Sequence, residues 1–448
     1  MIPPKPMSRD GRVGLLGYAR RFRTDILSAQ PARLYGAWMA EFRTPFFRSY
    51  MMNDPDLIEL VLKSRPEDFP KSNRIREGLA PLLGRSVFVT NGAEWRRQRR
   101  IIDPAFAGGR LREAFPGMRD AAAAMIARVR DGEQEVEELA SYAAADVIFR
   151  TLFSVPIEDS LAAEVFQKFR NYQRTQPLLN IAALIPLPHW LPRFHKRRTL
   201  GAARSIRAAI TALVERRAGE IAAGTAPGDL ATKIMTFPDP ETGQRFSPEE
   251  MVDQVAIFFL AGHETSASAM AWALYLLATH PDAQDRVAVE AVRDWETIMF
   301  SDLSKMPFTR DVFRETLRLY PPVPMMVRET TRAEVFRKRD APKGAQIVLS
   351  PWHLHRHTRM WNDPDGFDPD RWGTEATKES ARKAYIPFSA GPRVCTGAGF
   401  AMAEGVLLLG CLVGAFRIDP VGAPPVPVAH LTVRSKDGIR LRLTRRVV

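Results

Sequence analysis

The chain contains few cysteines. Its 448 residues include two, Cys395 and Cys411, and two cysteines cannot form the disulfide framework of a small secreted protein. A reducing compartment fits this count, so we expect a cytoplasmic protein.

Long hydrophobic runs are missing as well. No stretch of the sequence reaches the length that we expect of a membrane span. The N-terminus begins with the proline-rich segment 1–6 and soon carries Arg20, Arg21 and Arg23, without the apolar segment of a signal peptide. We therefore expect neither a secreted protein nor a transmembrane anchor.

Acidic residues are fewer than basic ones, 51 against 64, which gives a formal net charge of +13. A basic balance fits a nucleic acid, an anionic membrane or an acidic protein partner. The sequence has no zinc-ligand spacing, no aromatic RNA-binding signature and no basic tail, and its positive residues are dispersed. These absences exclude a nucleic-acid partner and favour an acidic protein.

Repeats and Gly/Ser linkers are also absent, while 35 prolines separate segments with helical spacing. The predicted helices are Pro55–Lys63, Ala93–Ile102, Leu111–Val129, Val136–Phe153, Leu161–Arg174 and Lys196–Ala223. The predicted strands are Phe42–Met51, Gln346–Leu349 and Leu431–Leu443, the last broken at 436–438. We predict one mainly α domain with small peripheral β-sheets, in which residues 1–53 form an N-terminal segment with the first strands and 54–448 the helical body.

The longest predicted helix runs from Pro248 to Thr279. Ser247 and Glu250 form a capping box at its start, with proline in the first helical position. Most of the helix is apolar all round, which is typical of a helix that crosses the centre of a large domain.

One of the two cysteines stands in a distinctive run, from Phe388 to Gly397. Cys395 precedes a helical pattern, and the unpaired N–H groups at a helix N-terminus favour a thiolate. Gly391 and Gly397 permit close approach of a bulky flat group, and Arg393 offers a charge to an anion on it. These are the needs of a thiolate that binds haem iron.

The pattern Phe-x-x-Gly-x-Arg-x-Cys-x-Gly resembles the haem-binding signature of the cytochrome P450 family. The resemblance implies that Cys395 is the axial ligand of haem b, and that Phe388, Arg393 and Gly397 contact the haem. The alternative is a buried cysteine in a turn, and Cys411, within an apolar helix, is predicted to be core of this kind.

The centre of the long helix reads Ala261-Gly262-His263-Glu264-Thr265. Glu264 and Thr265 are polar in an apolar helix, and a threonine hydroxyl that bonds back to a carbonyl can distort the helix and admit water. We predict a small polar notch for dioxygen. The resembled family has Ala/Gly-Gly-x-Asp/Glu-Thr here, which implies that Thr265 orients water at the oxygen, that Glu264 supplies protons and that Ala261 lines the haem. The alternative is a helix kink with satisfied polar groups, and His263 receives no catalytic role.

Glu315 and Arg318 lie three residues apart on one predicted helix. Together with Arg371 they resemble the Glu-x-x-Arg helix of the family and the arginine that completes its buried triad. The resemblance implies that they hold the cysteine loop in place and take no part in catalysis.

A further helix is predicted to be capped by Asn91 and to present Trp95 and Arg99 on one face. An indole N–H and a guanidinium can both donate to a carboxylate. This spacing resembles the Trp-x-x-x-Arg of the family, which contacts a haem propionate. Arg393 is expected to bind another propionate, and Arg328 fits the family's further propionate arginine.

The other arginines of this helix, Arg96, Arg97 and Arg100, are predicted to be solvated. They form either an ordinary basic surface or a docking face for an acidic electron donor.

Substrate contacts are expected from Leu79–Val89, Phe258, Phe259, Val323–Val327 and Leu431. These residues are nearly all apolar, which favours a hydrophobic substrate such as a fatty acid, terpenoid or steroid-like molecule. The apolar stretch Pro177–Pro192 is predicted to be an entrance lid, a membrane-touching patch or simply buried.

Taken together, the resemblance implies a monomeric haem-thiolate monooxygenase, which inserts one atom of O2 into its substrate. Electrons would come from NAD(P)H through a separate ferredoxin or flavodoxin and its reductase. Two alternatives remain, namely a haem-thiolate isomerase, lyase or peroxygenase, and a non-enzymatic haem-binding protein. The pair Glu264-Thr265 argues against the first, and the lack of an output domain argues against the second.

Overall fold

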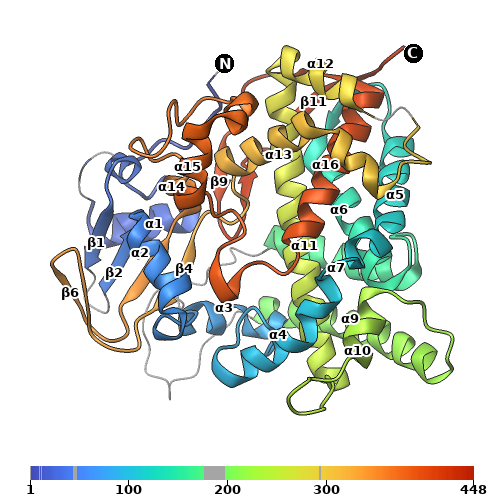
Figure 1. Cartoon of the computed structure of the whole chain (residues 1–448), viewed down its shortest axis with the longest axis horizontal. Coiled ribbons are helices and arrows are strands. Elements are labelled where there is room, and N and C mark those ends of the chain that lie inside the picture. Colours follow the sequence, from blue (N-terminus) through green and yellow to red (C-terminus); the bar gives the residue numbers. More distant parts are fainter. Residues whose placement is uncertain are drawn as a thin grey trace.

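The structure is a computed structural model that describes residues 2–9, 11, 13–43, 48–175, 197–291 and 294–447. The predicted lid or patch at 177–192 lies outside these residues. Figure 1 shows helices on one side of the molecule and a smaller region of strands on the other.

The long central helix, α11 (Pro248–Ala278), organises the helical side (Figure 1). Ser247 and Glu250 form the predicted capping box, with both reciprocal hydrogen bonds present. Beyond its first turn nearly every residue of α11 is buried, as expected of a helix that is apolar all round. The predicted central position is therefore confirmed.

The helices around α11 largely follow the predicted ranges. They are α2 (Pro55–Glu59) with a π-helix at Leu60–Ser64, α3 (Asn73–Leu83), α4 (Gly92–Phe106), α5 (Arg110–Arg128), α6 (Val136–Phe153), α7 (Ser160–Thr175), α9 (Arg197–Ala222), α10 (Leu230–Thr236), α12 (Pro281–Glu290), α13 (Pro307–Leu319), α15 (Glu375–Ala384) and α16 (Ala398–Ala415). α6 has the predicted bounds, because its apolar pattern begins and ends at those residues. Helices α1 (Leu15–Thr24), α3, α10, α12 and α15 were not predicted.

The strands form small sheets. The largest has the order β1 (Met39–Arg43), β2 (Arg48–Met52), β7 (Gln346–Leu349), β4 (Met326–Glu329), in which β2 and β7 are parallel. A second sheet contains β3 (Gly132–Glu135), β11 (Arg440–Arg445) and β8 (Phe416–Pro420), and two pairs consist of β5 (Glu334–Phe336) with β6 (Arg339–Ala341) and β9 (Pro427–Ala429) with β10 (Val433–Ser435). The predicted single strand Phe42–Met51 is wrong, since β1 and β2 pair as antiparallel neighbours.

Helix α16 corrects another expectation, that no stretch is long enough for a membrane span. Its 18 residues are long and apolar enough to cross a membrane, although most of them are buried inside the protein. Since α16 packs against α5, α11 and α13, its apolar surface is accounted for by helix packing.

Close packing explains one glycine of the central helix. A Cβ atom at Gly262 would lie 2.6 Å from the Cδ1 atom of Ile148, a residue of α6. The two helices therefore approach most closely where α11 has no side chain.

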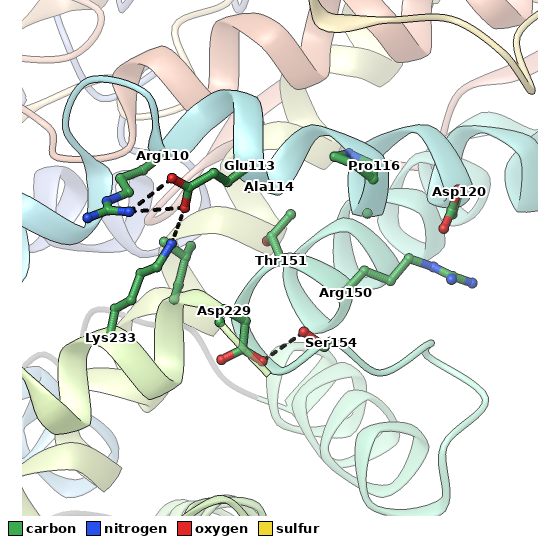
Figure 2. Close-up of a pocket in the computed structure, with 13 residues that line it drawn as sticks. Arg110, Glu113, Ala114, Pro116, Asp120, Arg150, Thr151, Ser154, Asp229 and Lys233 are labelled. Carbon is green, nitrogen blue, oxygen red and sulfur yellow. Dashed lines mark hydrogen bonds and ion pairs between the residues drawn. The ribbon is translucent and has the colours of Figure 1, made fainter. Parts of the chain in front are cut away.

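A cavity of about 370 Å³ lies between α5, the end of α6 and α10 (Figure 2). Its charges pair with one another: Arg110 and Lys233 both bind Glu113, and Ser154 donates to Asp229. No residue predicted to bind a cofactor or substrate lines this cavity, so the candidate site must be sought around Cys395.

Candidate active site

Cys395 lies in the loop between a short 3₁₀ turn (Gly391–Arg393) and α16. Its backbone N–H donates to the Phe388 carbonyl at 2.9 Å, which closes the loop. Its side chain is exposed, whereas Cys411 is buried in α16. Burial raises the pKa of the Cys395 thiol, and the Gly397 N–H and the Arg99 guanidinium oppose that increase.

The two glycines of the loop have different roles. Gly391 has φ +67°, and a Cβ atom there would overlap the backbone carbonyl of Leu62 in the π-helix. The expectation that Gly391 admits a flat group is therefore wrong, because this glycine seats the loop on the π-helix. At Gly397 an added Cβ would meet only the Cys395 sulfur, at 4.0 Å. A contact of Gly397 with the haem stays a prediction.

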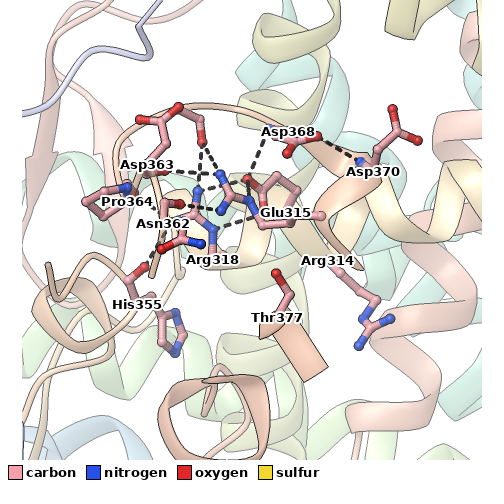
Figure 3. A network of polar contacts seen from close by, with 12 residues as sticks. Arg314, Glu315, Arg318, His355, Asn362, Asp363, Pro364, Asp368, Asp370 and Thr377 are labelled. Carbon is pink, nitrogen blue, oxygen red and sulfur yellow. Dashed lines mark hydrogen bonds and ion pairs between the residues drawn. The ribbon is translucent and has the colours of Figure 1, made fainter. Parts of the chain in front are cut away.

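A buried ionic triad supports this loop (Figure 3). Both carboxylate oxygens of Glu315 accept from Arg318, at 2.8 and 2.9 Å, and one of them also accepts from Arg371 at 2.9 Å. The predicted contact among the three residues is confirmed. Each arginine also donates to backbone carbonyls, so that neither guanidinium is left unsatisfied by burial.

The triad reaches the cysteine loop through His355. Arg318 donates to the His355 carbonyl at 2.9 Å, and the His355 Nε2 atom accepts from the backbone N–H of Ile386 at 2.9 Å. Burial, and next the Arg318 charge, lower the pKa of His355 to about 3. His355 is therefore a neutral acceptor that joins the triad to the start of the Cys395 loop.

A second set of cations surrounds Trp95. The Arg393 guanidinium lies 5.0 Å from the ring centroid, the Lys71 Nζ atom 5.6 Å and the Arg99 guanidinium 5.9 Å. Arg328, on β4, is buried beside them, and burial together with Arg393 lowers its pKa to about 10. The structure thus brings together the four predicted propionate contacts and adds Lys71, which no sequence motif had indicated.

These cations lack acidic partners. Arg99 pairs with Asp103, but among the residues that the structure describes no carboxylate forms an ion pair with Lys71, Arg328 or Arg393. The Nε atoms of Arg328 and Arg393 are buried without a hydrogen-bond partner. Since buried charge without a partner is costly, this cluster requires an anionic ligand. The two carboxylates of haem b fit that requirement.

The oxygen side of the predicted site lies on α11. Ala261 is exposed and Thr265 is half-buried, although the helix around them is buried. The Thr265 hydroxyl donates to the Ala261 carbonyl. The expected distortion of the helix is wrong, since α11 is a continuous α-helix, and this back-bond keeps the hydroxyl on the helix without breaking the ladder.

Glu264 points to a different place from Thr265. It is buried and forms an ion pair with Arg434, at a polar cavity of about 210 Å³ that His263 and Ser141 also line. Burial raises the pKa of Glu264, and Arg434 opposes that increase. No hydrogen bond joins Glu264 to Thr265 in the described part of the chain, so the predicted acid–threonine pair is not formed by direct contact.

Three predictions about neighbouring residues are wrong. Asn91 precedes α4 without capping it, because its side chain instead exchanges two hydrogen bonds with the backbone of Lys71. Arg97 and Arg100 are not free in solvent, since they pair with Glu250 and Asp239.

Among the predicted substrate contacts, Phe259 is also wrong. Phe259 packs in the core against Phe149 and Phe169, with ring centroids 4.9 and 4.6 Å away. Phe258, by contrast, is half-buried on the same side of α11 as Ala261. Phe258 therefore stays a predicted contact.

A cysteine exposed beside a helix N-terminus, a braced loop and a buried cation cluster without acids define a haem-thiolate protein. Comparisons with known proteins agree. A family model described as Cytochrome P450 matches residues 33–441. The chain belongs to the cytochrome P450 family, and is a monooxygenase with a haem-thiolate cofactor.

Individual relatives support the assignment. Cyclooctat-9-en-7-ol 5-monooxygenase of Streptomyces melanosporofaciens is 31% identical over 422 residues, 92% of this chain and 89% of the relative. Cytochrome P450 4A10 of Mus musculus is 30% identical over 428 residues, 88% and 80% of the two chains. The crystal structure of the cytochrome P450DA haem domain has a TM-score of 0.81 at 23% identity, covering 100% of this chain and 97% of that one. The mainly helical fold with small peripheral sheets is the P450 fold.

Proposed function

We propose that this monooxygenase acts on a hydrophobic small molecule of the fatty acid, terpenoid or steroid-like class. The observation that carries the proposal is the face of α11 that holds Phe258, Ala261 and Thr265, where an otherwise buried apolar helix becomes accessible around one hydroxyl. Such a face holds an apolar substrate by contact and offers one polar group to oxygen. A relative at 31% identity is named for the oxidation of cyclooctat-9-en-7-ol, an unsaturated alcohol, which agrees with this class.

Cys395, Thr265 and Glu264 are the residues to which we assign the chemistry. Bound haem supplies iron that binds and reductively activates O2, and a thiolate ligand favours O–O cleavage. Thr265 holds a water or the dioxygen by its hydroxyl. Glu264 accepts protons at its carboxylate from the polar cavity and releases them toward α11. Because Glu264 is paired with Arg434, this release requires the ion pair to open.

The ligand assignment is tested by the carbon monoxide complex of the reduced protein. We expect the red-shifted Soret band of a thiolate complex in the wild type and its loss in Cys395→His. Cys411→Ser is the matched control, because Cys411 is buried in α16. Persistence of the band in Cys395→His would contradict the assignment.

The oxygen-side assignment is tested by Thr265→Ala. With electrons supplied through a ferredoxin and its reductase, we expect NAD(P)H consumption to continue while the share that forms product falls by roughly tenfold, as is typical of losing one positioned proton-transfer group. Thr279→Ala at the end of α11 is the control, since its hydroxyl makes the same kind of back-bond. Undiminished product formation in Thr265→Ala would refute the role.

The substrate class is tested by the low-to-high-spin shift on binding. A long-chain fatty acid, a terpenoid alcohol and a steroid are the three probes. We expect at least one probe to give a saturable shift, and absence of a shift with all three would refute the proposed class.

We also propose that the enzyme is a cytoplasmic monomer that receives electrons from a separate acidic ferredoxin or flavodoxin. The net charge of +13 supports such a partner. Arg96 is exposed and has a weak contact with Glu67 at 3.4 Å, so it is available for docking. The reduction rate should fall as salt rises, because steering between opposite charges is screened. A rate independent of salt would contradict an acidic partner.

A further inference from the structure

We propose that Lys71 binds a carboxylate of the haem directly, as a fourth cation beside Arg99, Arg328 and Arg393. The proposal rests on the haem cofactor and is independent of the substrate and of the oxygen-side residues.

Backbone contacts fix Lys71 in this position. Lys71 immediately precedes the helix cap Ser72 of α3, and its backbone forms an isolated antiparallel bridge with Arg328. The Asn91 side chain accepts from the Lys71 N–H and donates to its carbonyl, at 3.0 Å each. Lys71 is thus tied on one side to the strand of Arg328 and on the other to the start of the Trp95 helix.

The side chain then reaches the ring of Trp95, at 5.6 Å. Arg393 and Arg99 lie within 6 Å of the same ring, so three cations from three segments of the chain surround one indole. Interaction with an aromatic face stabilises a cation by about 0.5–2 kcal/mol, which does not offset the burial of several like charges. A negatively charged group beside them does.

The hydrogen bonds of the ammonium group leave room for such a group. The Nζ atom donates to the carbonyls of Val87 and Thr90, at 2.5 and 3.2 Å. An ammonium has three N–H donors, so one remains, and no side chain among the described residues accepts it. Burial, and next the charges of Arg328, Arg393 and Arg99, lower the pKa of Lys71 well below its usual value. A carboxylate would restore the charged form.

A purely structural role is the competing explanation. The bonds to Val87 and Thr90 close the segment that follows α3, and a lysine could serve that purpose without touching the haem. The two roles differ in one respect, because only direct binding depends on the carboxylates of the ligand.

The experiment compares haem with its dimethyl ester, in which both carboxylates are blocked. Apoprotein is reconstituted with each, and the rate of transfer to excess apomyoglobin is measured for the wild type, Lys71→Met and Lys71→Gln. Lys343→Met, an exposed lysine, is the control. We expect the Lys71 variants to release haem about tenfold faster than the wild type, a difference of about 1.4 kcal/mol, and to release the ester at the wild-type rate within about twofold.

Equal acceleration of haem and ester release would overturn the proposal in favour of the structural role, and so would an unchanged rate for haem. Lys71→Gln retains two N–H donors for the carbonyls of Val87 and Thr90, which keeps the test valid if Lys71→Met does not fold. Turnover is not measured, so failure of the proposed substrate class or of the Thr265 assignment leaves this result unaffected.

Discussion

The protein buries two sets of arginines in contrasting ways. Around Glu315, two guanidiniums share one carboxylate and use their other donors on backbone carbonyls. Around Trp95, Arg328 and Arg393 have few hydrogen bonds, and their Nε atoms have no partner. Both sets are within the protein, and both consist of residues far apart in the sequence.

The difference teaches how to separate a brace from a binding site. A buried cation whose partners are all protein groups is already satisfied, and removing one partner is destabilising. A buried cation without an acidic partner is satisfied only when an anion binds. Because neither property depends on family membership, the same comparison applies to other chains with buried arginines.

The largest effect is expected in the brace. Glu315→Ala leaves Arg318 and Arg371 buried without their carboxylate, so the free energy of unfolding should fall by about 3–5 kcal/mol. Urea denaturation of the haem-loaded protein measures the loss. Glu375→Ala, on an exposed side chain of α15 paired with Lys378, should change it by less than about 0.5 kcal/mol. Similar values for the two variants would remove the distinction.

Acid should weaken the brace next. The pKa of His355 is about 3 in the fold and about 6.5 in the unfolded chain, so the neutral ring stabilises the fold fully above pH ~6.5. This contribution is lost as the pH falls toward 3, and amounts to about 2 kcal/mol at pH 5. His355→Gln keeps an acceptor for Ile386 and should make the pH profile of unfolding less steep. An unchanged profile would show that His355 is not a neutral link.

A smaller effect, of opposite sign, is expected in the cation cluster. Arg328→Met removes a buried charge that has no acidic partner, so the unfolding free energy of the apoprotein should stay the same or rise. Haem release from the same variant should be about tenfold faster, about 1.4 kcal/mol. Arg318→Met is the contrasting variant, since it should destabilise the apoprotein. A loss of apoprotein stability in Arg328→Met would place Arg328 with the brace.

The smallest effect is the response of the apoprotein to an inorganic anion. Sulfate at a concentration equal to its dissociation constant should stabilise the apoprotein by about 0.4 kcal/mol. The thermal midpoint of Arg328→Met should respond less than that of the wild type, which corrects for the general stabilisation by sulfate. Equal responses would mean that the cluster does not bind anions before haem.

Sequence patterns predicted the elements well where periodicity was long. The bounds of α6 and the capping box of α11 followed directly from residue types. The Cys395 run and the Glu315 triad were predictable because the family's motifs retain fixed spacing. The pairing of β1 with β2 was not, since a run of strand-forming residues does not show where the chain turns back.

The rest of the site depends on contacts between distant segments. Phe258 and Phe259 are adjacent and chemically identical, and only the packing of α6 and α7 shows which of them is core. Lys71 belongs to no motif, and its place beside Trp95 follows from the bridge to Arg328. Gly391 matched the motif, but its partner, the Leu62 carbonyl, lies over 300 residues away in the chain.

That contact has a consequence for how the thiolate is placed. The segment Leu60–Ser64 is a π-helix, which contains one residue more per turn than an α-helix. Gly391 rests on a carbonyl of this extra-wide turn, so the insertion acts as a spacer beneath the cysteine loop. Deleting one residue there would return the turn to α-geometry and shift the support by about 1.5 Å. The sulfur position is thus adjustable by chain length at a site more than 300 residues from Cys395.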